Sequence, residues 1–317
     1  MKHFQVIIVG AGPAGSACAR KLVNAGIDCL ILDKDIFPRQ KTCAGWITPG
    51  VFSDIGVKPD AYPYDLTKFP RLKININGFP IIRPGKQYAI RRIEFDDWLL
   101  KRSRAEFITH QVKRIWSTDQ GYCVDGLYRA EYLIGAGGTH CPVYHTFFNE
   151  SEVRSGARIV ALEDEYLANW SDPFCRLWFF ENNLPGYAWY VPKKNGYLNI
   201  GVGGNSTALK ERGNTIQEHW DGLVHNLQTL GLIQDGSLNP RGYIYHLRGA
   251  ERMINREKIY LIGDAAGLAT LDMGEGIGPA IRSGILAAES ILDHVPYSVA
   301  GISKYSLLPP GLRWLVT

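Results

Sequence analysis

A glycine-rich turn near the start of the chain has the residue types and spacing of a phosphate-binding loop. It follows directly on the apolar run Phe4–Val9 and precedes a predicted helix over Ser16–Ala25. In such a turn the first glycine permits a tight bend, the second lets the backbone approach a pyrophosphate, and the third lets helix and strand pack closely. The start of the helix adds N–H groups and a positive dipole end. We predict that a nucleotide is bound there by Gly10, Gly12, Pro13, Ala14 and Gly15.

An acidic residue closes the second strand of this predicted βαβ unit. The apolar run Cys29–Leu32 ends in Asp33, 18 residues after Gly15. This is close to the spacing of about 20 that is typical of an acid that binds a ribose hydroxyl. Because a carboxylate repels a 2′-phosphate, the site disfavours NADP and suits FAD or NAD. We expect Asp33 and the adjacent Lys34 to contact the cofactor.

A second glycine cluster lies about 250 residues further along the chain. The apolar run Lys258–Ile262 precedes G-D-A-A-G over residues 263–267, and M-G-E-G-I-G follows over residues 273–278. A helix is predicted from Pro279 to about Leu292. The first of these glycine segments could also be an ordinary strand-ending turn in which its aspartate caps locally.

Together these segments resemble the FAD-binding fold of the glutathione-reductase class, in the branch that contains aromatic hydroxylases, flavin halogenases and geranylgeranyl reductases. The resemblance implies that Asp264 contacts the ribityl chain or pyrophosphate of FAD, and that residues 274–278 pass the pyrimidine edge of the flavin. There the helix N-terminus favours negative charge on the reduced flavin at N1 and O2. The implied cofactor residues of this region are Gly263, Asp264, Ala265, Gly274, Gly276, Ile277 and Gly278.

Three further segments resemble geranylgeranyl reductases in particular. Residues 38–46 (PRQKTCAGW) resemble their R-x-K-x-C-G-G segment, with Ala44 in place of a glycine. Residues 92–99 (RIEFDDWL) resemble their R-x-x-F-D-x-x-L helix. Residues 185–192 (PGYAWYVP) and 196–203 (GYLNIGVG) resemble their P-G-Y-G-W-x-F-P…N-x-G-x-G strand pair. The resemblance runs in order along most of the chain.

The same resemblance implies site residues in these three segments. Cys43 would lie near the flavin and the substrate double bond, although a small buried thiol is the common alternative. Tyr187 and Trp189 would line the substrate cavity, or else pack within the sheet. Arg39 would hold FAD phosphates or belong to a solvated loop, and Arg92 would contact FAD or cap its own helix. The implied cofactor contacts here are Arg39, Cys43, Ala44, Gly45 and Arg92.

One segment departs from the pattern of the branch. Residues 134–142 (IGAGGTHCP) stand where the branch carries G-A-D-G-x-x-S, and Gly137 replaces the aspartate. In the hydroxylases that segment helps to bind both FAD and NADPH. Its loss weakens a hydroxylase assignment and removes a usual anchor for NADPH.

Composition excludes several classes of protein. The chain has 317 residues, 45% of them hydrophobic and 34 of them glycine, with a net charge of +4. These values exclude a disordered chain and a disulfide-rich miniprotein, and give no case for nucleic-acid binding. The six cysteines show no C-x-x-C pair and the histidines no metal-ligand spacing, so we predict no metal site and a cytoplasmic location. Neither a signal peptide nor a bilayer-spanning run is found. Peripheral contact with the inner face of the membrane stays open.

We predict an α/β protein in which a Rossmann-like FAD-binding domain is interleaved with an antiparallel-sheet (α+β) substrate or cap domain. The FAD-binding domain would comprise residues 1–69, 93–154 and 251–295. The cap domain would comprise residues 70–92 and 155–250, and residues 296–317 would form a short C-terminal tail. Asn77-Gly78 predicts a hairpin in the second sheet, and Ala208–Leu230 predicts a helical region covering that sheet.

Three functions compete. The first is an FAD-dependent reductase that delivers hydride from reduced flavin to a carbon–carbon double bond of an isoprenoid or other apolar, lipid-like substrate, with NAD(P)H or a ferredoxin-like protein as reductant. The second is a flavin monooxygenase or halogenase, since residues 186–192 resemble the W-x-W-x-I-P segment of halogenases, although no segment matches the lysine that a halogenase needs. The third is a degenerate FAD-binding module, which the missing aspartate and the short C-terminal region motivate.

Overall fold

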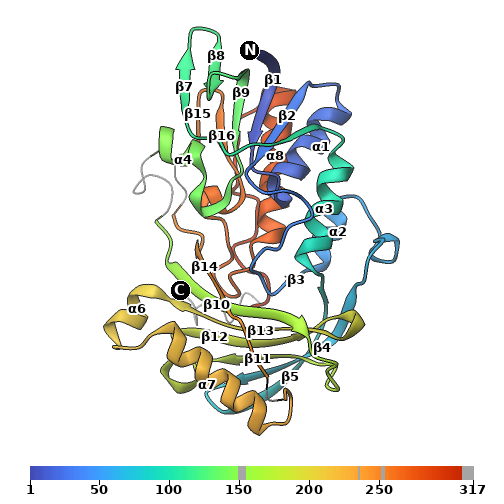
Figure 1. Ribbon diagram of the computed structural model, residues 1–317, viewed down its shortest axis with the longest axis vertical. Coiled ribbons are helices and arrows are strands. Elements are labelled where there is room, and N and C mark those ends of the chain that lie inside the picture. The colour runs from blue at the N-terminus through green and yellow to red at the C-terminus, as the bar shows by residue number, and fades with distance from the viewer. Residues whose placement is uncertain (149–154, 235, 251–253, 309–317) are drawn as a thin grey trace. The chain divides into compact units, whose positions relative to one another are not determined.

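The chain forms two compact units, each built from separate stretches of sequence (Figure 1). The structure, a computed structural model, describes residues 1–148, 155–234, 236–250 and 254–308. Unit 1 comprises Met1–Arg39, Ile93–Gly156 and His246–Thr317, and unit 2 comprises Gln40–Arg92 and Ala157–Tyr245. The two units are therefore interleaved along the chain, and each has a sheet of its own.

Unit 1 is built on a mainly parallel sheet in the strand order β15-β16-β9-β1-β2-β6, with the antiparallel pair β8 and β7 beside β9. Val9 is in register with both Leu32 and Gly135, so three parallel strands end at one edge of the sheet. In open α/β sheets, ligands bind at this carboxyl edge. The strands are β1 (Lys2–Val9), β2 (Cys29–Asp33), β6 (Glu106–Thr109), β7 (Ile115–Thr118), β8 (Gly121–Val124), β9 (Tyr128–Gly135), β15 (Asn255–Arg256) and β16 (Ile259–Leu261). The helices are α1 (Pro13–Asn24), α3 (Arg92–Ser103), α4 (Pro142–Phe147) and α8 (Ile277–Asp293).

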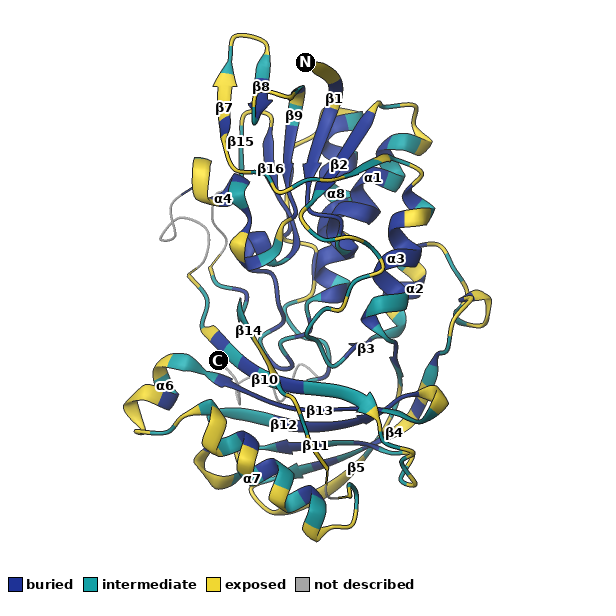
Figure 2. Cartoon of the chain, viewed as in Figure 1, coloured by how far each residue is buried: buried dark blue, intermediate teal, exposed yellow. Residues whose placement is uncertain are grey.

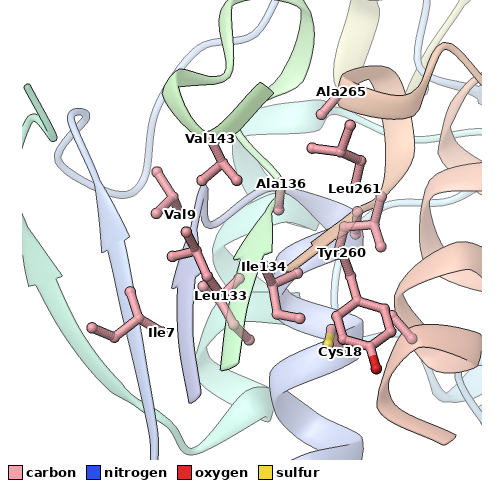
Figure 3. Close-up of a cluster of buried hydrophobic side chains, with 14 of the residues drawn as sticks. Ile7, Val9, Cys18, Leu133, Ile134, Ala136, Val143, Tyr260, Leu261 and Ala265 are labelled. Carbon is pink, nitrogen blue, oxygen red and sulfur yellow. The ribbon is translucent and has the colours of Figure 1, made fainter. Parts of the chain in front are cut away.

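The core of unit 1 forms because its central strands are apolar on both faces. Residues 6–9 and 30–32 are at most 5% exposed, as is typical of parallel strands that are covered on both sides. Figure 3 shows side chains of β1, β9 and β16 in one cluster with Cys18 of α1. This core holds the sheet edge and the helix α1 rigidly, and so fixes the turn between them.

Unit 2 is built on a second sheet in the order β14-β10-β13-β12-β11-β4-β5-β3. Its described pairs are antiparallel, except that β11 and β4 run parallel. The strands are β3 (Trp46–Ile47), β4 (Thr67–Ile76), β5 (Phe79–Ala89), β10 (Arg158–Leu167), β11 (Cys175–Phe179), β12 (Gly186–Pro192), β13 (Tyr197–Asn205) and β14 (Arg241–His246). The helices are α2 (Pro49–Asp54), α6 (Ser206–Glu211) and α7 (Ile216–Thr229).

Helices α6 and α7 cover one face of this second sheet. Figure 2 shows α7 with buried residues on one side and exposed residues on the other. The buried side packs Trp220, Leu223 and Leu227 against strand residues such as Tyr190 and Ile200. Because side chains alternate along a strand, residues 187 and 189 of β12 point to the opposite face of the sheet.

The predicted fold class is confirmed, and most predicted elements form within a few residues of their expected ends. The hairpin turn is confirmed too, because Asn77 and Gly78 adopt φ values of 47° and 86°, as a type I′ turn requires. The predicted helical region 208–230 is two helices, α6 and α7, which Gly213 separates in a left-handed conformation at φ 69°.

The division between the domains differs from the prediction at residues 40–69, and also at residues 246–250, which were expected in the cap domain but belong to unit 1. Residues 40–69 were expected in the FAD-binding domain, but they belong to unit 2. The reason is strand pairing, since β3 pairs with β5, and β4 pairs with both β5 and β11. The predicted boundaries at 154 and 251, and the end of the tail from residue 309, lie outside the described residues.

Candidate functional site

Two positions of the glycine turn after β1, Gly10 and Gly15, leave no space for a side chain. Gly10 has a φ of 118°, and a Cβ there would lie 2.3 Å from the carbonyl oxygen of Ala136. A Cβ on Gly15 would lie 2.0 Å from the carbonyl oxygen of Gly10. Both distances are far below van der Waals contact, so these two glycines set the shape of the turn. The structure thus gives them the packing roles that the sequence predicts.

Gly12 differs from its two neighbours because it faces open space. It is the N-cap of α1, with φ −67° and no side-chain cap, and the atom nearest to an added Cβ would be Nη2 of Arg39 at 3.7 Å. The start of α1 therefore presents a positive dipole end beside an arginine. This is the arrangement that binds phosphate at helix N-termini.

Arg39 itself is held in place with one nitrogen unused. Its Nη2 lies 3.2 Å from the carboxylate of the fully buried Asp96, whereas its buried Nη1 has no hydrogen-bond partner among the described residues. A buried donor without a partner costs free energy unless a ligand satisfies it. The glycine turn and the start of α1 form a cradle, and this cradle together with Nη1 of Arg39 fits the pyrophosphate of a dinucleotide.

Asp33 lies at the end of β2 and faces the same turn. Its Oδ2 accepts the N–H of Ala11 at 2.7 Å, and its Oδ1 accepts the N–H of Asp35 at 3.0 Å. Each carboxylate oxygen has a second lone pair, so Asp33 can still accept a ribose hydroxyl while it fixes the turn. Lys34 is exposed, and its predicted contact with the cofactor stays a prediction.

The second glycine cluster meets the first within unit 1. A Cβ on Gly263 would lie 3.1 Å from the Cβ of Ala14, and a Cβ on Gly276 would lie 3.1 Å from Oδ1 of Asp264. Residues 10–15, 263–265 and 274–278 therefore form one continuous surface, although about 250 residues separate the two ends. This is the placement that an FAD site of the predicted type needs.

Glu275 is a residue of this surface whose role the sequence analysis missed. Its side chain is buried and its Oε1 accepts the N–H of Gly278 at 2.6 Å, so a carboxyl group already caps the start of α8. Burial, with added repulsion from Asp272 and Asp264, raises the pKa of Glu275 to about 7. The sequence feature that could have indicated this role is an acidic residue between the glycines of residues 273–278.

Asp272 ties a later part of the chain to the same surface. Its carboxylate accepts the N–H groups of Ser306, Leu307 and Leu308 at 2.7 to 3.1 Å. Buried Arg248 in turn donates to the carbonyl oxygens of residues 299 and 302. The described part of the predicted tail is therefore packed into unit 1.

Gly137, which stands in the place of the aspartate of the hydroxylases, is closely packed. A Cβ at this position would lie 3.1 Å from the Cα of Cys141 and 3.4 Å from its Sγ. The turn is thus packed around Cys141, which is fully buried. An aspartate here would require Cys141 to shift by a few tenths of an ångström.

The predicted substrate residues Tyr187 and Trp189 lie side by side on unit 2, on the sheet face opposite α7. Their ring centroids are 5.6 Å apart, and Phe179 stacks on Tyr187 at 5.0 Å. Trp189 lies across Gly201 of β13, where a Cβ would come within 2.2 Å of the indole. The glycines of residues 201–203 thus make room for aromatic side chains.

A buried hydrogen-bonded chain joins Trp189 to Cys43. The indole Nε1–H donates to Oδ1 of Asn199 at 2.7 Å, and the Asn199 amide donates to Oε2 of Glu163 at 2.8 Å. The other carboxyl oxygen of Glu163 accepts the backbone N–H of Cys43 at 2.6 Å. Two predicted catalytic residues are therefore connected through two residues that the sequence analysis did not single out.

A second polar group lies on the same face of the sheet. Buried Lys193 forms an ion pair with Glu165, whose other oxygen accepts from Nε of Arg91 at 3.0 Å. Burial alone would raise the pKa of Glu165, but the two cations lower it below its usual value. For Glu163 burial prevails, and its pKa is raised although Asn199 and Lys193 oppose the shift. Both polar groups could have been inferred from the sequence, because Glu163 and Glu165 lie two residues apart in the mainly apolar strand β10 and so face the same side of the sheet.

The remaining predicted contacts lie in unit 2. Gly45 is buried, Ala44 is partly buried, and the Gly45 N–H donates to Sγ of Cys43 at 3.4 Å. Arg92 is buried at the first position of α3. Their predicted contacts with FAD stay predictions. No helix in the described ranges is long and apolar enough to cross a membrane.

A family model described as FAD binding domain matches residues 3–63. An uncharacterised protein of Methanosarcina barkeri is 31% identical over 92% of this chain and 75% of its own length. Digeranylgeranylglycerophospholipid reductase 1 of Methanopyrus kandleri is 26% identical over 92% of this chain and 81% of its own length.

Two solved structures share the fold along nearly the whole chain. A geranylgeranyl bacteriochlorophyll reductase-like protein of Thermoplasma acidophilum has a TM-score of 0.78 at 22% identity, and the match covers 93% of this chain and 80% of that one. A flavin-dependent brominase has a TM-score of 0.71 at 18% identity, with 96% and 81% covered. These two likenesses show the shared fold, and the match to the FAD binding domain model, together with the cradle in unit 1, identifies FAD as the cofactor.

Proposed function

The chain belongs to the geranylgeranyl reductase family of FAD-dependent oxidoreductases, and we propose that it reduces a carbon–carbon double bond of an isoprenoid or similar lipid-like substrate. When FAD is bound, its reduced flavin supplies a hydride. The hydride adds to one carbon of the double bond, a proton adds to the other, and the π bond is lost. The observation that carries this proposal is the joined pair of Cys43 and Trp189 beside an aromatic sheet face.

The residues of unit 1 bind and orient the cofactor in this proposal. The start of α1 and Arg39 hold the pyrophosphate, because both offer N–H groups that no described side chain satisfies. Asp33 accepts a ribose hydroxyl, and Asp264 contacts the ribityl chain or pyrophosphate. Preorganised donors of this kind bind without rearrangement of the protein.

The residues of unit 2 bind the substrate in this proposal. Phe179, Tyr187 and Trp189 offer an apolar aromatic surface, which suits the flat, branched hydrocarbon of a prenyl chain better than a polar ligand. The hydrogen-bonded chain ends at the backbone N–H of Cys43. The family resemblance places the side chain of this cysteine beside the double bond. The relative from Methanopyrus kandleri, named as a digeranylgeranylglycerophospholipid reductase, supports a substrate of this class.

The reductant is either NAD(P)H or a ferredoxin-like protein. The described residues of unit 1 form one pyrophosphate cradle, which is assigned to FAD, so NAD(P)H would bind only transiently and elsewhere. A test of the chemistry should therefore bypass the natural donor.

We expect the FAD-loaded protein, reduced with dithionite under nitrogen, to add two hydrogen atoms per double bond to digeranylgeranylglycerophospholipid presented in detergent micelles. Mass spectrometry of the lipid measures the gain, and the flavin absorbance should return as substrate is consumed. Cys43→Ala, which leaves unit 1 untouched, should keep FAD and lose most turnover. Cys123→Ala, a buried cysteine on β8, serves as the matched control and should behave as the wild type.

Failure of every prenyl lipid to gain hydrogen, with FAD fully reduced, would refute the reductase function. Oxygen consumption linked to a hydroxylated or brominated product would favour the second candidate, a monooxygenase or halogenase, which the fold of the brominase supports. The buried lysine of unit 2, Lys193, is committed to an ion pair with Glu165, which counts against halogenase chemistry. A bound FAD that dithionite cannot reduce would indicate the third candidate, a degenerate module.

We also propose that the protein is cytoplasmic and touches the membrane through the β4–β5 hairpin. Three apolar residues near its tip are exposed, namely Phe79 by 75%, Ile81 by 46% and Ile82 by 62%. This part of β5 is an edge strand, because β3 pairs with it only at Tyr88 and Ala89. Exposed Arg71 and Lys86 on the same hairpin suit an anionic lipid surface.

We expect the protein to cosediment with vesicles of phosphatidylglycerol more than with vesicles of phosphatidylcholine. Burial of a Phe or Ile side chain contributes roughly 2 kcal/mol, so the double variant Phe79→Ser/Ile82→Ser should lower the partition coefficient by at least about tenfold. Leu127→Ser, at a 50% exposed leucine of unit 1, should leave it unchanged. Equal sedimentation of the hairpin variant and the wild type would refute this contact.

A further inference from the structure

We infer that Glu163 and Asn199 are positioning residues that hold the Cys43 segment and the Trp189 indole in one fixed arrangement. This inference rests on the proposed function, in which Cys43 and Trp189 act on the substrate. It goes further by assigning the orientation of both to a single buried pair of side chains. Neither Glu163 nor Asn199 would be exchangeable for a residue of similar size.

In the hydrogen-bonded chain from Trp189 to Cys43, the two terminal groups fix the direction of every hydrogen bond. The indole nitrogen of Trp189 can only donate, and so can the backbone nitrogen of Cys43. Asn199 must therefore turn its oxygen to Trp189 and its amide nitrogen to Glu163. Glu163 must accept on both oxygens, which a carboxylate does and an amide cannot.

Burial makes this arrangement costly to break. Glu163 is 6% exposed, Asn199 is 0% exposed and Trp189 is 7% exposed. A buried donor or acceptor that loses its partner destabilises the arrangement, because water does not replace the bond. These hydrogen bonds therefore have one low-energy arrangement, and the backbone N–H of Cys43 is part of it.

The position of the Cys43 backbone also sets the position of its thiol. The Gly45 N–H donates to Sγ of Cys43 at 3.4 Å, so the segment from 43 to 45 closes a small turn around the sulfur. One end of this turn is fixed by Glu163. A shift of the Cys43 N–H therefore moves the sulfur as well.

Burial raises the pKa of Glu163, and the hydrogen bond from Asn199 and the charge of Lys193 oppose this rise. Lys193 lowers the cost of its ionisation, while Glu165, two residues along β10, opposes it. Glu165 is itself neutralised by Lys193 and Arg91. This face of the sheet therefore carries two carboxyl groups and two cationic side chains. The cations can stabilise a carboxylate that bulk solvent does not reach.

A donor–acceptor exchange tests the inference. Glu163→Gln would turn an N–H group toward another donor, and Asn199→Asp would place two carboxylates face to face. In the double variant Glu163→Gln/Asn199→Asp, the glutamine accepts from Cys43 and donates to Asp, and the aspartate accepts from Trp189. Every hydrogen bond is then restored, with the same net charge as the wild type.

Alkylation of Cys43 gives a readout that needs neither substrate nor turnover. Cys43 is the partly exposed cysteine, whereas the other five are buried, so iodoacetamide followed by peptide mass spectrometry reports on its segment in the FAD-loaded protein. We expect each single variant to change the alkylation rate by about tenfold, as the lost bond implies. The double variant should return to within about threefold of the wild type.

Two further variants keep the test decisive. Asp164→Asn changes an acid on the other face of β10 that accepts only a loop N–H in the described structure, and it should leave alkylation unchanged. Trp189→Phe removes the indole N–H together with part of the ring, keeps an aromatic side chain at this position, and should alter alkylation even if both single variants fail to fold.

Wild-type alkylation in Glu163→Gln and Trp189→Phe, or a double variant as perturbed as the two singles combined, would overturn the inference. If the exchange pattern appears but no prenyl lipid is reduced, the positioning role stands and the proposed substrate falls. If turnover proceeds and alkylation ignores all variants, the proposed function stands and the positioning role falls.

Discussion

Gly12→Ala is expected to weaken FAD binding severely while the protein remains folded. The φ of Gly12 is −67° and the nearest atom to an added Cβ is 3.7 Å away, so alanine fits the empty turn without strain. The same Cβ would occupy the space through which the pyrophosphate approaches the backbone. A clash of about 2 kcal/mol, typical of overpacking by one methyl group, raises the dissociation constant about 30-fold.

Titration of apoprotein with FAD, followed by flavin fluorescence, measures this effect. Gly222→Ala in the middle of α7 is the matched control, because no atom lies within 4 Å of its Cβ position. It should bind FAD normally and gain up to about 1 kcal/mol from better helix propensity. Gly12→Ala protein that purifies yellow, with wild-type affinity, would show that the pyrophosphate does not pass this turn.

Glu275→Gln is expected to stabilise the apoprotein at alkaline pH and to have little effect at acidic pH. The folded protein raises the pKa of Glu275 from 4.5 to about 7, so it holds this proton more tightly than the unfolded chain does. The free energy of unfolding therefore falls as pH rises from about 4.5 to about 7. The rise in pKa from 4.5 to about 7 corresponds to a loss of up to roughly 3.4 kcal/mol.

Glutamine cannot ionise, so the variant escapes this loss while its oxygen can still accept the N–H of Gly278. The melting temperature of wild type and variant, measured at pH 5 and pH 8, checks the prediction. Glu289→Gln, on α8 at a partly exposed ion pair with Lys21 of α1, should show no such dependence because exposed pairs contribute little. An equal difference in melting temperature at both pH values would contradict a raised pKa.

The glycine turn and the hairpin could be predicted from the sequence because both are local. Gly15 packs against the backbone of Gly10, five residues earlier, and Gly10 supplies the positive φ of the bend, although its close neighbour Ala136 is distant in the sequence. Asn77-Gly78 needs only the twist of its two strands. Asp33 could be predicted because the length of one helix fixes its distance from the turn. The family resemblance added Asp264, whose link to the first turn no local rule shows.

Other features depended on contacts between distant strands. Residues 40–69 join unit 2 because β4 pairs with β11, about 100 residues later in the sequence, and no local pattern specifies that pairing. Glu163, Asn199 and Trp189 look like ordinary members of three separate strands until the register of β10, β12 and β13 places them on one face.

The sequence by itself thus determined the class of protein and the cofactor turn, because backbone conformation and spacing follow from neighbouring residues. Only the tertiary structure decided which polar groups are buried together. Glu275 gains its raised pKa from burial beside two other acids, and Glu163 gains its partners from strand register. Hydrogen bonding and desolvation depend on the whole surroundings of a side chain, and those surroundings exist only once the sheets have formed.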